Sequence, residues 1–402
     1  MTDEPNSPTD AEQFVMEQHA GRQLLDQMMS VAQPSVTQID RWRKQYGSDQ
    51  VSAGLRLALA RRRASGKFTH ALEMWLDSTG LEQASDERVA RYKAARFRRV
   101  AGSEPVFDLC CGIGMDAIAL AEGGPVLAVD RDHERCRRAR WNLGVYEVSA
   151  RALVVCADVE RMGSLNSRWV HVDPDRRAGR DRRARSVADY APGLSFLKGL
   201  QQAARGGGIK LSPASDFELH FGGPELEIEL VSLAGECKEA TVWFGAAATC
   251  RRRATVLPAQ ISFCDLDASD QSAAPVEQPG DWIYTPDPAL VRAGLLDRFG
   301  ALHGLKRVGP GVDWLTGRAL ESPFLARFAV RAVLPFDLKR LKRELNARQL
   351  VPQTIKVWGL DVSPEDLRRR LSGGEGGQPT TLLLYLPQGT GCRVQAVIAD
   401  RC

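Results

Sequence analysis

The sequence predicts an α/β protein with a doubly wound parallel sheet, preceded by a helical domain and followed by a small α+β domain. From Val106 onward, short apolar runs alternate with helix-like segments, which is typical of βαβ units. These runs are apolar throughout, as expected for strands that helices cover on both faces. Residues 1–100 instead repeat apolar positions three and four apart, which predicts helices.

The length and composition are those of a water-soluble protein of two or three domains. The chain has 402 residues, of which 44% are hydrophobic and 26% are charged, and it has no apolar run of 18 residues. Its first residues, MTDEPNSPTDAEQF, are acidic and polar, unlike a signal or transit peptide. We therefore expect a cytoplasmic protein with no membrane contact.

Cysteine and histidine spacing predicts neither disulfides nor a metal site. The nine cysteines are scattered and form no C-x-x-C pair, and the six histidines are isolated. The net charge of +4 permits an anionic partner without requiring one.

We expect a helical domain over residues 1–100, with a helix over 11–32 and a second, capped helix that follows Pro34 and ends at Gly47. Two further segments with helical periodicity are 51–66 and 85–100.

The sheet is expected within residues 101–264. Three consecutive strand candidates after Pro213 lack intervening helices and predict an antiparallel edge. They are 226–234, 239–249 and 253–258. The earlier strand candidates are 106–111, 126–130, 152–158, 169–174 and 208–213, and the helices between them are 115–124, 132–146 and 191–206.

A Ser-, Ala- and Pro-rich stretch over 265–282 predicts a linker or surface loop, and residues 283–402 predict the α+β domain. A predicted helix over 335–349 carries a basic stripe, which fits either a phosphate backbone contact or a solvated face. The basic residues are Lys339, Arg340, Lys342 and Arg343, with Lys356 on the next strand.

The segment DLCCGIG, residues 108–114, forms a glycine turn between the first strand and the following helix. Such a turn directs backbone N–H groups and a helix N-terminus at a ligand, here around Gly112 and Gly114. Asp108 inside the strand would repel a pyrophosphate but favour a cationic ligand with an amino group. This indicates S-adenosylmethionine rather than a dinucleotide.

Two later strands also end in aspartates. Asp130 follows Gly112 by 18 residues, a spacing from which a carboxylate can accept ribose hydroxyls. Asp158 ends the third strand, where a side chain can reach an adenine amine. Each aspartate could instead cap the helix that follows it, but the ordered set favours a ligand site.

Residues 106–213 resemble the core of the class I S-adenosylmethionine-dependent methyltransferases. The segments DLCCGIGMDAIALA and AVDRDHERCRRARWN resemble RNA-modifying members, including the trimethylguanosine synthase type. The whole chain resembles a bacterial group of these enzymes with a THUMP-like C-terminal domain. The segments that carry this resemblance are TGLEQASDERVARYKAARF, DPDRR, PDPALVRAGL and LPFDLKRLKRELNAR. It implies a Rossmann-like, seven-stranded sheet, S-adenosylmethionine as donor and RNA as partner.

The resemblance also places Asp173 and Pro174 at the end of the fourth strand, beside the methyl donor. Enzymes that methylate exocyclic amines carry an Asp/Asn/Ser-Pro-Pro-aromatic motif there, whose acid or amide and following carbonyl accept bonds from the target amine. This chain has Asp175 and Arg176 in the last two positions, so an aromatic stack on the base is in doubt. We assign Asp173 and Pro174 as the catalytic pair.

Arginines follow this motif at 176, 177, 180, 182, 183 and 185. Guanidinium can stack on a base or bind phosphate, so Arg176 and Arg177 are assigned to the substrate and the later ones to the surface. Lys210, at the end of the fifth strand, is either a substrate contact or a rim residue. The thiols of Cys110 and Cys111 lie beneath the donor, which favours a core role over covalent catalysis.

The sequence thus predicts a methyltransferase that modifies RNA at a base nitrogen by direct transfer. Two alternatives remain: a small-molecule or protein methyltransferase for an anionic substrate, and an inactive protein that binds the donor and RNA.

Overall fold

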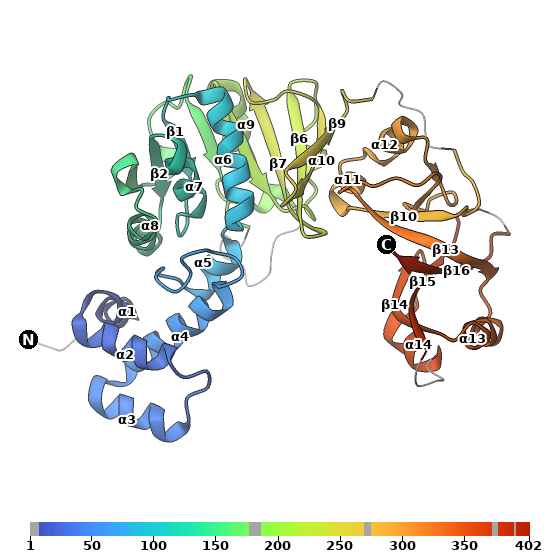
Figure 1. The fold of residues 1–402 in the computed structure, drawn as a ribbon. Coiled ribbons are helices and arrows are strands. Elements are labelled where there is room, and N and C mark those ends of the chain that lie inside the picture. The colour runs from blue at the N-terminus through green and yellow to red at the C-terminus, as the bar shows by residue number, and fades with distance from the viewer. Residues whose placement is uncertain (1–7, 177–185, 269–274, 372–376, 390) are drawn as a thin grey trace, which may run out of the picture. The chain divides into compact units, whose positions relative to one another are not determined.

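The computed structural model describes residues 8–176, 186–268, 275–371, 377–389 and 391–402 (Figure 1). The chain divides into two compact units. One contains Met1–Glu225 and Val242–Ala248, and the other contains Leu226–Thr241 and Thr249–Cys402. The predicted domain boundaries at 101, 265 and 283 stay predictions.

A nine-stranded sheet has the order β3-β2-β1-β4-β5-β7-β6-β8-β9. Its first five strands in this order pair in parallel, which confirms the predicted α/β fold class. Their bounds are β1 Val106–Leu109, β2 Val126–Asp130, β3 Ala152–Cys156, β4 Trp169–Val172 and β5 Gly206–Leu211. The remaining strands are β6 Leu226–Leu233, β7 Glu236–Gly245, β8 Arg252–Leu257 and β9 Ile261–Cys264.

The edge of this sheet differs from the prediction of simple antiparallel pairing. Strands β6 and β8 pair in parallel, whereas β8 and β9 pair in antiparallel orientation. The strand order explains the difference: β7 lies between β5 and β6, so β8 joins the other side of β6 after a second reversal. The described sheet therefore has two strands more than the seven that the resemblance implies.

Helices between the parallel strands pack on the sheet and carry the residues of the site. They are α7 Met115–Gly123, α8 His133–Val145, α9 Leu194–Ala203 and α10 Phe217–His220, with 3-10 turns η1 Ser149–Arg151, η2 Val159–Arg161 and η3 Val187–Asp189. The core between α7, α8 and β1 includes Ile118, Leu120 and Val106, all fully or almost fully buried.

The N-terminal region is helical, as predicted. Its helices are α1 Pro8–Glu17, α2 His19–Met29, α3 Val36–Tyr46, α4 Ser48–Ala64, α5 Ser78–Gln83 and α6 Glu87–Ala101. The capped helix that ends at Gly47 is confirmed, with a capping box between Ser35 and Gln38. The single helix predicted over 11–32 is wrong, because the chain is extended at Gln18. Gly21 then packs so closely on Phe14 that a Cβ would lie 2.0 Å from its carbonyl oxygen.

The C-terminal region contains a second sheet, of order β11-β12-β10-β13-β16-β15-β14. Helices α13 Leu338–Ala347 and α14 Pro364–Leu371 bury leucines against one face of it. Its longer strands are β10 Trp282–Pro286, β13 Leu325–Pro335, β14 Leu350–Trp358, β15 Gln378–Tyr385 and β16 Gln395–Arg401. The shorter elements are β11 Lys306–Arg307, β12 Leu315–Thr316, α11 Pro288–Arg292 and α12 Leu296–His303. No helix in the described part of the chain is both long and apolar enough to cross a membrane.

Candidate functional site

In the turn between β1 and α7, every second residue from Cys110 to Gly114 has a positive φ. Gly112 has φ 57° and Gly114 has φ 90°, and Cys110 adopts φ 61° although it is not glycine. A Cβ on Gly112 would meet no atom within 4 Å, so its backbone borders open space. A Cβ on Gly114 would lie 3.1 Å from Ala139 of α8, so this glycine permits the close approach of α8.

Two adjoining hollows open at the carboxyl ends of the parallel strands, where open α/β sheets bind ligands. The first, of about 50 Å³, is lined by Gly112, Asp173, Pro174 and Arg176 among others. The second, of about 40 Å³, is lined among others by two of the predicted aspartates, Asp130 and Asp158. The structure thus brings six of the predicted residues to one place. The other predicted residues among those described, Asp108, Gly114 and Lys210, lie outside the two linings.

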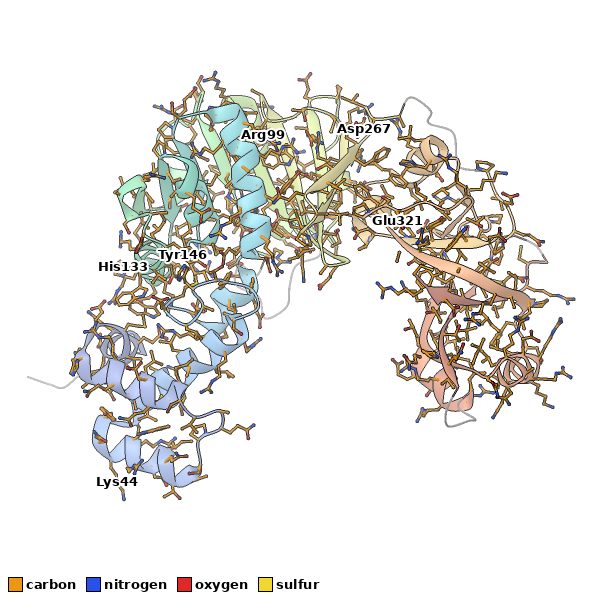
Figure 2. All side chains as sticks on the ribbon, in the orientation of Figure 1. Lys44, Arg99, His133, Tyr146, Asp267 and Glu321 are labelled. Atoms are coloured by element: carbon orange, nitrogen blue, oxygen red, sulfur yellow. The ribbon has the colours of Figure 1, made fainter. Side chains whose placement is uncertain are left out.

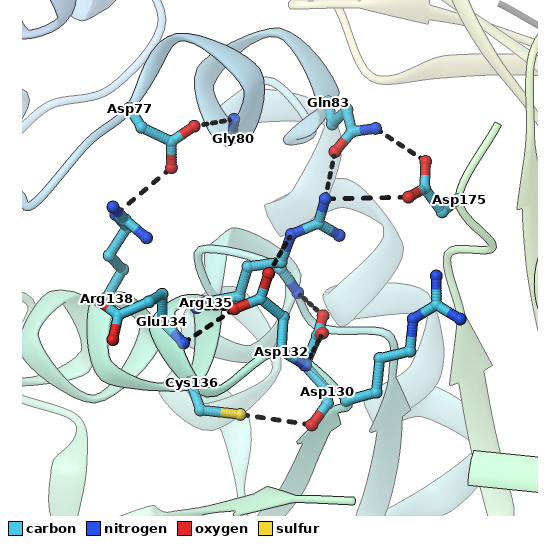
Figure 3. Close-up of polar contacts among 12 residues, drawn as sticks. Asp77, Gly80, Gln83, Asp130, Asp132, Glu134, Arg135, Cys136, Arg138 and Asp175 are labelled. Carbon is cyan, nitrogen blue, oxygen red and sulfur yellow. Dashed lines mark hydrogen bonds and ion pairs between the residues drawn. The ribbon is translucent and has the colours of Figure 1, made fainter. Parts of the chain in front are cut away.

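The hollows share a wall made of Cys110, Arg135 and Asp175. Figure 3 shows how Gln83 of α5 connects the two charged residues of this wall. Its amide oxygen accepts a bond from Arg135 Nη2 at 3.3 Å, and its amide nitrogen donates to Asp175 Oδ1 at 2.9 Å. The Arg135 and Asp175 side chains also approach each other to 3.8 Å. A residue of the N-terminal helices therefore forms part of the site.

The Asp130 carboxylate lies at the end of β2, beside the glycine turn. Its two oxygens accept the backbone N–H groups of Gly112 at 2.9 Å and Asp132 at 3.0 Å. Burial raises the pKa of Asp130, and these two hydrogen bonds act in the opposite direction. Asp130 does not cap α8, since Asp132 has that role.

Asp158, in contrast, is the N-cap of η2. Its carboxylate accepts the N–H of Glu160 at 3.1 Å and lies 3.5 Å from Arg161. The capping alternative therefore applies to Asp158, which also borders the second hollow.

Asp173 follows β4 and is held in place by two contacts. Its N–H donates to Leu109 O at 3.1 Å, and its Oδ2 accepts a bond from Lys210 Nζ at 2.6 Å. Lys210 also donates to Gln83 O at 3.2 Å. Lys210 thus acts on the hollow indirectly, by fixing the carboxylate of Asp173.

Beneath the turn lies a buried polar chain that starts at Asp108. Asp108 and His171 are partners in the register of β1 and β4, and His171 Nδ1 lies 2.7 Å from Asp108 Oδ1. Lys93 of α6 then lies 3.4 Å from His171 Nε2 and 2.9 Å from Asp116 Oδ1. Ser85 donates to the other oxygen of Asp116 at 2.7 Å.

The pKa values of the two acids in this polar chain shift in opposite directions. Burial raises the pKa of Asp108, and the bond with His171 only partly offsets the effect. Burial also opposes ionisation of Asp116, but the ammonium of Lys93 lowers the pKa of Asp116 far below its usual range. Asp116 is therefore a carboxylate at neutral pH, paired inside the protein.

The cysteines of the turn are poor nucleophiles. Burial raises the pKa of both thiols, Cys110 and Cys111, well above the usual value, and neighbouring aspartates add to the effect. Covalent catalysis is therefore disfavoured for both; Cys111 is buried as predicted, whereas Cys110 is part-buried and borders both hollows.

Arg176 is the one residue of the arginine run that borders a hollow within the described part of the chain. Arg177 and the arginines at 180, 182, 183 and 185 lie outside the described residues. The assignment of Arg177 to the substrate therefore stays a prediction.

One cluster could be considered for a metal. Cys250, Cys264 and Asp265 bring ligand atoms within 4.8 Å of one another. However, Arg253 donates to Cys250 Sγ at 3.3 Å, and Asp265 Oδ1 accepts the N–H of Arg251 at 3.0 Å. Burial also raises the pKa of Cys250, against the thiolate that a metal needs. The predicted lack of a metal site stays a prediction.

Sequence reasoning missed Gln83, Arg135, Lys93 and His171. Their polar partners are 92 residues away for Gln83 and 63 for His171, so no local spacing signals them. Gln83, Lys93 and Arg135 lay within segments that carried the resemblance, but nothing in those segments indicated their contacts.

Comparison with known families gives two matches in the chain. Residues 103–187 match the model of RNA cap guanine-N2 methyltransferases. This segment contains strands β1 to β4 and Asp173. Residues 325–400 match the THUMP domain-like model.

Whole-chain relatives agree with these matches. A crystal structure of a candidate methyltransferase from Porphyromonas gingivalis W83 superposes with a TM-score of 0.74 at 21% identity, over 94% of this chain and 98% of that one. Two uncharacterised S-adenosylmethionine-dependent methyltransferases of Mycobacterium tuberculosis, from strains CDC 1551 and H37Rv, are 37% identical over 330 residues. These cover 78% of this chain and 87% of each relative. The chain therefore belongs to the S-adenosylmethionine-dependent methyltransferases, as an enzyme with a THUMP-like C-terminal region.

Proposed function

We propose that this methyltransferase acts on RNA and transfers the methyl group directly to a base nitrogen. The observation that carries the proposal is the position of Asp173 and Pro174 on the wall of the first hollow, beside the open backbone of Gly112. The match of residues 103–187 to RNA cap guanine-N2 methyltransferases supports an amine of a base as the acceptor.

The residues of the two hollows fit S-adenosylmethionine. The open space at Gly112 leaves room for a ligand against the backbone, and Asp130 and Asp158 border the second hollow, where they can accept bonds from ribose hydroxyls and the adenine amine. Asp108 Oδ2 is buried and has no hydrogen-bond partner among the described residues, but Asp108 lies outside both linings, so its contact with the donor's ammonium stays a prediction. When bound, S-adenosylmethionine supplies an electrophilic methyl group on a sulfonium sulfur.

Binding of a donor across both hollows requires their shared wall to move. Each hollow is far smaller than the roughly 300–1,000 Å³ of typical ligand pockets. Arg135 and Asp175 form the wall between them, so we expect these two side chains to turn aside when the donor binds.

The protein's own contribution to the reaction is alignment of the acceptor. Lys210 holds Asp173 Oδ2, which leaves Oδ1 to accept a hydrogen bond from the target amine, while the carbonyl of Pro174 accepts a second. Alignment of this kind supplies much of the rate when the methyl group is already a strong electrophile. Arg176, with Arg177, would stack on the base or bind a phosphate beside it.

The test uses full-length protein with radiolabelled donor, and with total bacterial RNA or a metabolite extract as acceptor. We expect label in RNA, and a loss on the order of 10²-fold or more with Asp173→Ala. S-adenosylhomocysteine affinity, measured by calorimetry, should be unchanged in this variant. Asp361→Ala, an exposed aspartate of the C-terminal region, is the matched control and should be fully active.

Three results would contradict parts of the proposal. Label in metabolites but not in RNA would reject RNA as the substrate. Full activity of Asp173→Ala would reject Asp173 as the acceptor-aligning residue, and donor binding without transfer to either acceptor would favour an inactive binding protein.

A further inference from the structure

The C-terminal unit contains a cavity of about 650 Å³, which is much larger than either hollow of the methyltransferase core. All of its lining residues belong to this one unit. They come from the β6–β7 turn, the end of β8, the β10–α11 junction, the loop 320–324, and strands β13, β14 and β16. Most of this lining lies outside the segment that matches the THUMP domain-like model.

Two cations in this lining, Lys356 and Arg401, form no ion pair with any residue that the structure describes. Lys356 of β14 is half-buried; its Nζ donates to Thr285 Oγ1 at 2.9 Å and lies 5.4 Å from the centre of the Phe328 ring. Within the described part of the chain, no carboxylate, that of Cys402 included, pairs with Lys356 or Arg401. Burial lowers the pKa of Lys356, and the nearby charge of Arg401 lowers it further.

The two acidic side chains that line the same cavity already have other partners. Glu321, labelled in Figure 2, pairs with Arg327 at 3.2 Å, so these two charges compensate each other. Asp287 is buried and caps α11 by accepting the N–H of Ala289 at 2.8 Å. The two acidic side chains of the lining are thus engaged by Arg327 and by the N-terminus of α11, and neither pairs with Lys356 or Arg401.

A partly desolvated ammonium with no anion partner is costly, and an incoming oxyanion relieves that cost. Phosphate suits the pair, because lysine acts as a point charge and arginine as a planar fork. The volume lies within the range of pockets that hold a ligand of nucleotide size. We propose that this cavity binds a phosphate group, anchored by Lys356 and completed by Arg401, on a nucleotide or on a nucleic acid strand.

The experiment measures two probes on the full-length protein. Calorimetry follows AMP, with adenosine as the probe that lacks phosphate, and fluorescence anisotropy follows a 12-nucleotide single-stranded RNA. The variants are Lys356→Gln and Arg401→Gln, together with Lys356→Arg, which keeps the charge. Lys44→Gln is the matched control, because Lys44 is exposed on α3, outside the cavity.

We expect AMP to bind and adenosine not to bind. Lys356→Gln should weaken AMP binding at least tenfold, whereas Lys356→Arg and Lys44→Gln should stay within about threefold of the wild type. A parallel loss of RNA binding identifies a nucleic acid strand as the source of the phosphate, and a loss confined to AMP identifies a free nucleotide. Melting temperatures of all variants show whether the fold is intact.

The proposal is overturned if neither probe binds the wild-type protein, if Lys356→Gln binds both as tightly as the wild type, or if Lys44→Gln weakens binding equally. None of these outcomes depends on methyl transfer, because both probes report binding alone. A failure of the proposed RNA methylation would therefore leave this result unaffected.

Discussion

Cys110 occupies the backbone position with the clearest local strain in the site. At φ 61° its Cβ approaches the backbone in a way that glycine avoids, at a cost of about 1–2 kcal/mol. The residue borders both hollows and its thiol is protonated at neutral pH, since burial raises its pKa. Its side chain therefore shapes the wall of the site rather than reacting.

Replacing Cys110 tests this strain. Cys110→Gly is expected to be about 0.5–1 kcal/mol more stable than Cys110→Ala, because both remove the thiol but only glycine relieves the positive φ. Urea denaturation of the two variants measures the difference. Equal stability would mean that the turn relaxes to a negative φ when alanine is present.

At the scale of elements, buried charge ties helix α6 to helix α7 and to the sheet. Lys93 of α6 lies between Asp116 of α7 and His171 of β4, and all three are almost fully buried. Such a pair is strongly destabilising when one partner is lost, because the other charge stays buried. The N-terminal helices are therefore joined to the catalytic core by charge as well as by apolar packing.

Lys93→Met is expected to lower the free energy of unfolding by about 3–5 kcal/mol at pH 7. In the wild type the depressed pKa of Asp116 stabilises the fold above the ordinary carboxyl range, and this contribution is lost as pH falls through the folded pKa. Without Lys93, burial instead raises the pKa of Asp116, so the variant should regain stability as pH falls from 7 to 5.

The double variant Lys93→Met/Asp116→Asn is the matched control. Asp108, His171 and Ser85 face the same cluster in both variants, so their contributions cancel in the comparison. The double variant should lack the gain at low pH. The same gain in both variants would mean that the effect does not come from Asp116.

At the scale of the whole molecule, residues on both sides of the predicted boundary at 283 pack together. Helix α11 packs on β6 and β8, and Leu290 at this contact is completely buried. Phe263 of β9 also forms ring contacts with Phe299 and Phe324. These strands precede the predicted linker, yet they belong to the same compact unit as the C-terminal residues.

A fragment of residues 283–402 is therefore expected to expose this apolar surface. We expect it to bind the dye ANS and to melt without a sharp transition, whereas a fragment of 226–402 should melt cooperatively. Calorimetry and dye fluorescence make the comparison. A sharp transition of the shorter fragment, at the temperature of the longer one, would support the boundary predicted at 283.

The sequence by itself determined the elements and the local part of the site. Gly112, Gly114 and Asp130 were predictable because a strand, a tight turn and a helix follow one another within a few residues, and backbone sterics decide such turns locally. The placing of Asp173 at the end of β4 followed from the family resemblance and the strand pattern, and the structure has it there. The nature of the donor follows from the family to which the chain belongs.

Only the tertiary structure decided which distant side chains meet. His171 faces Asp108 because β4 pairs with β1 in register, and Gln83 reaches Asp175 because both residues line the first hollow. The two uncompensated cations of the C-terminal cavity, Lys356 and Arg401, likewise come from different strands. Contacts of this kind depend on strand order and helix packing, which involve residues far apart along the chain and leave no periodic signal in it.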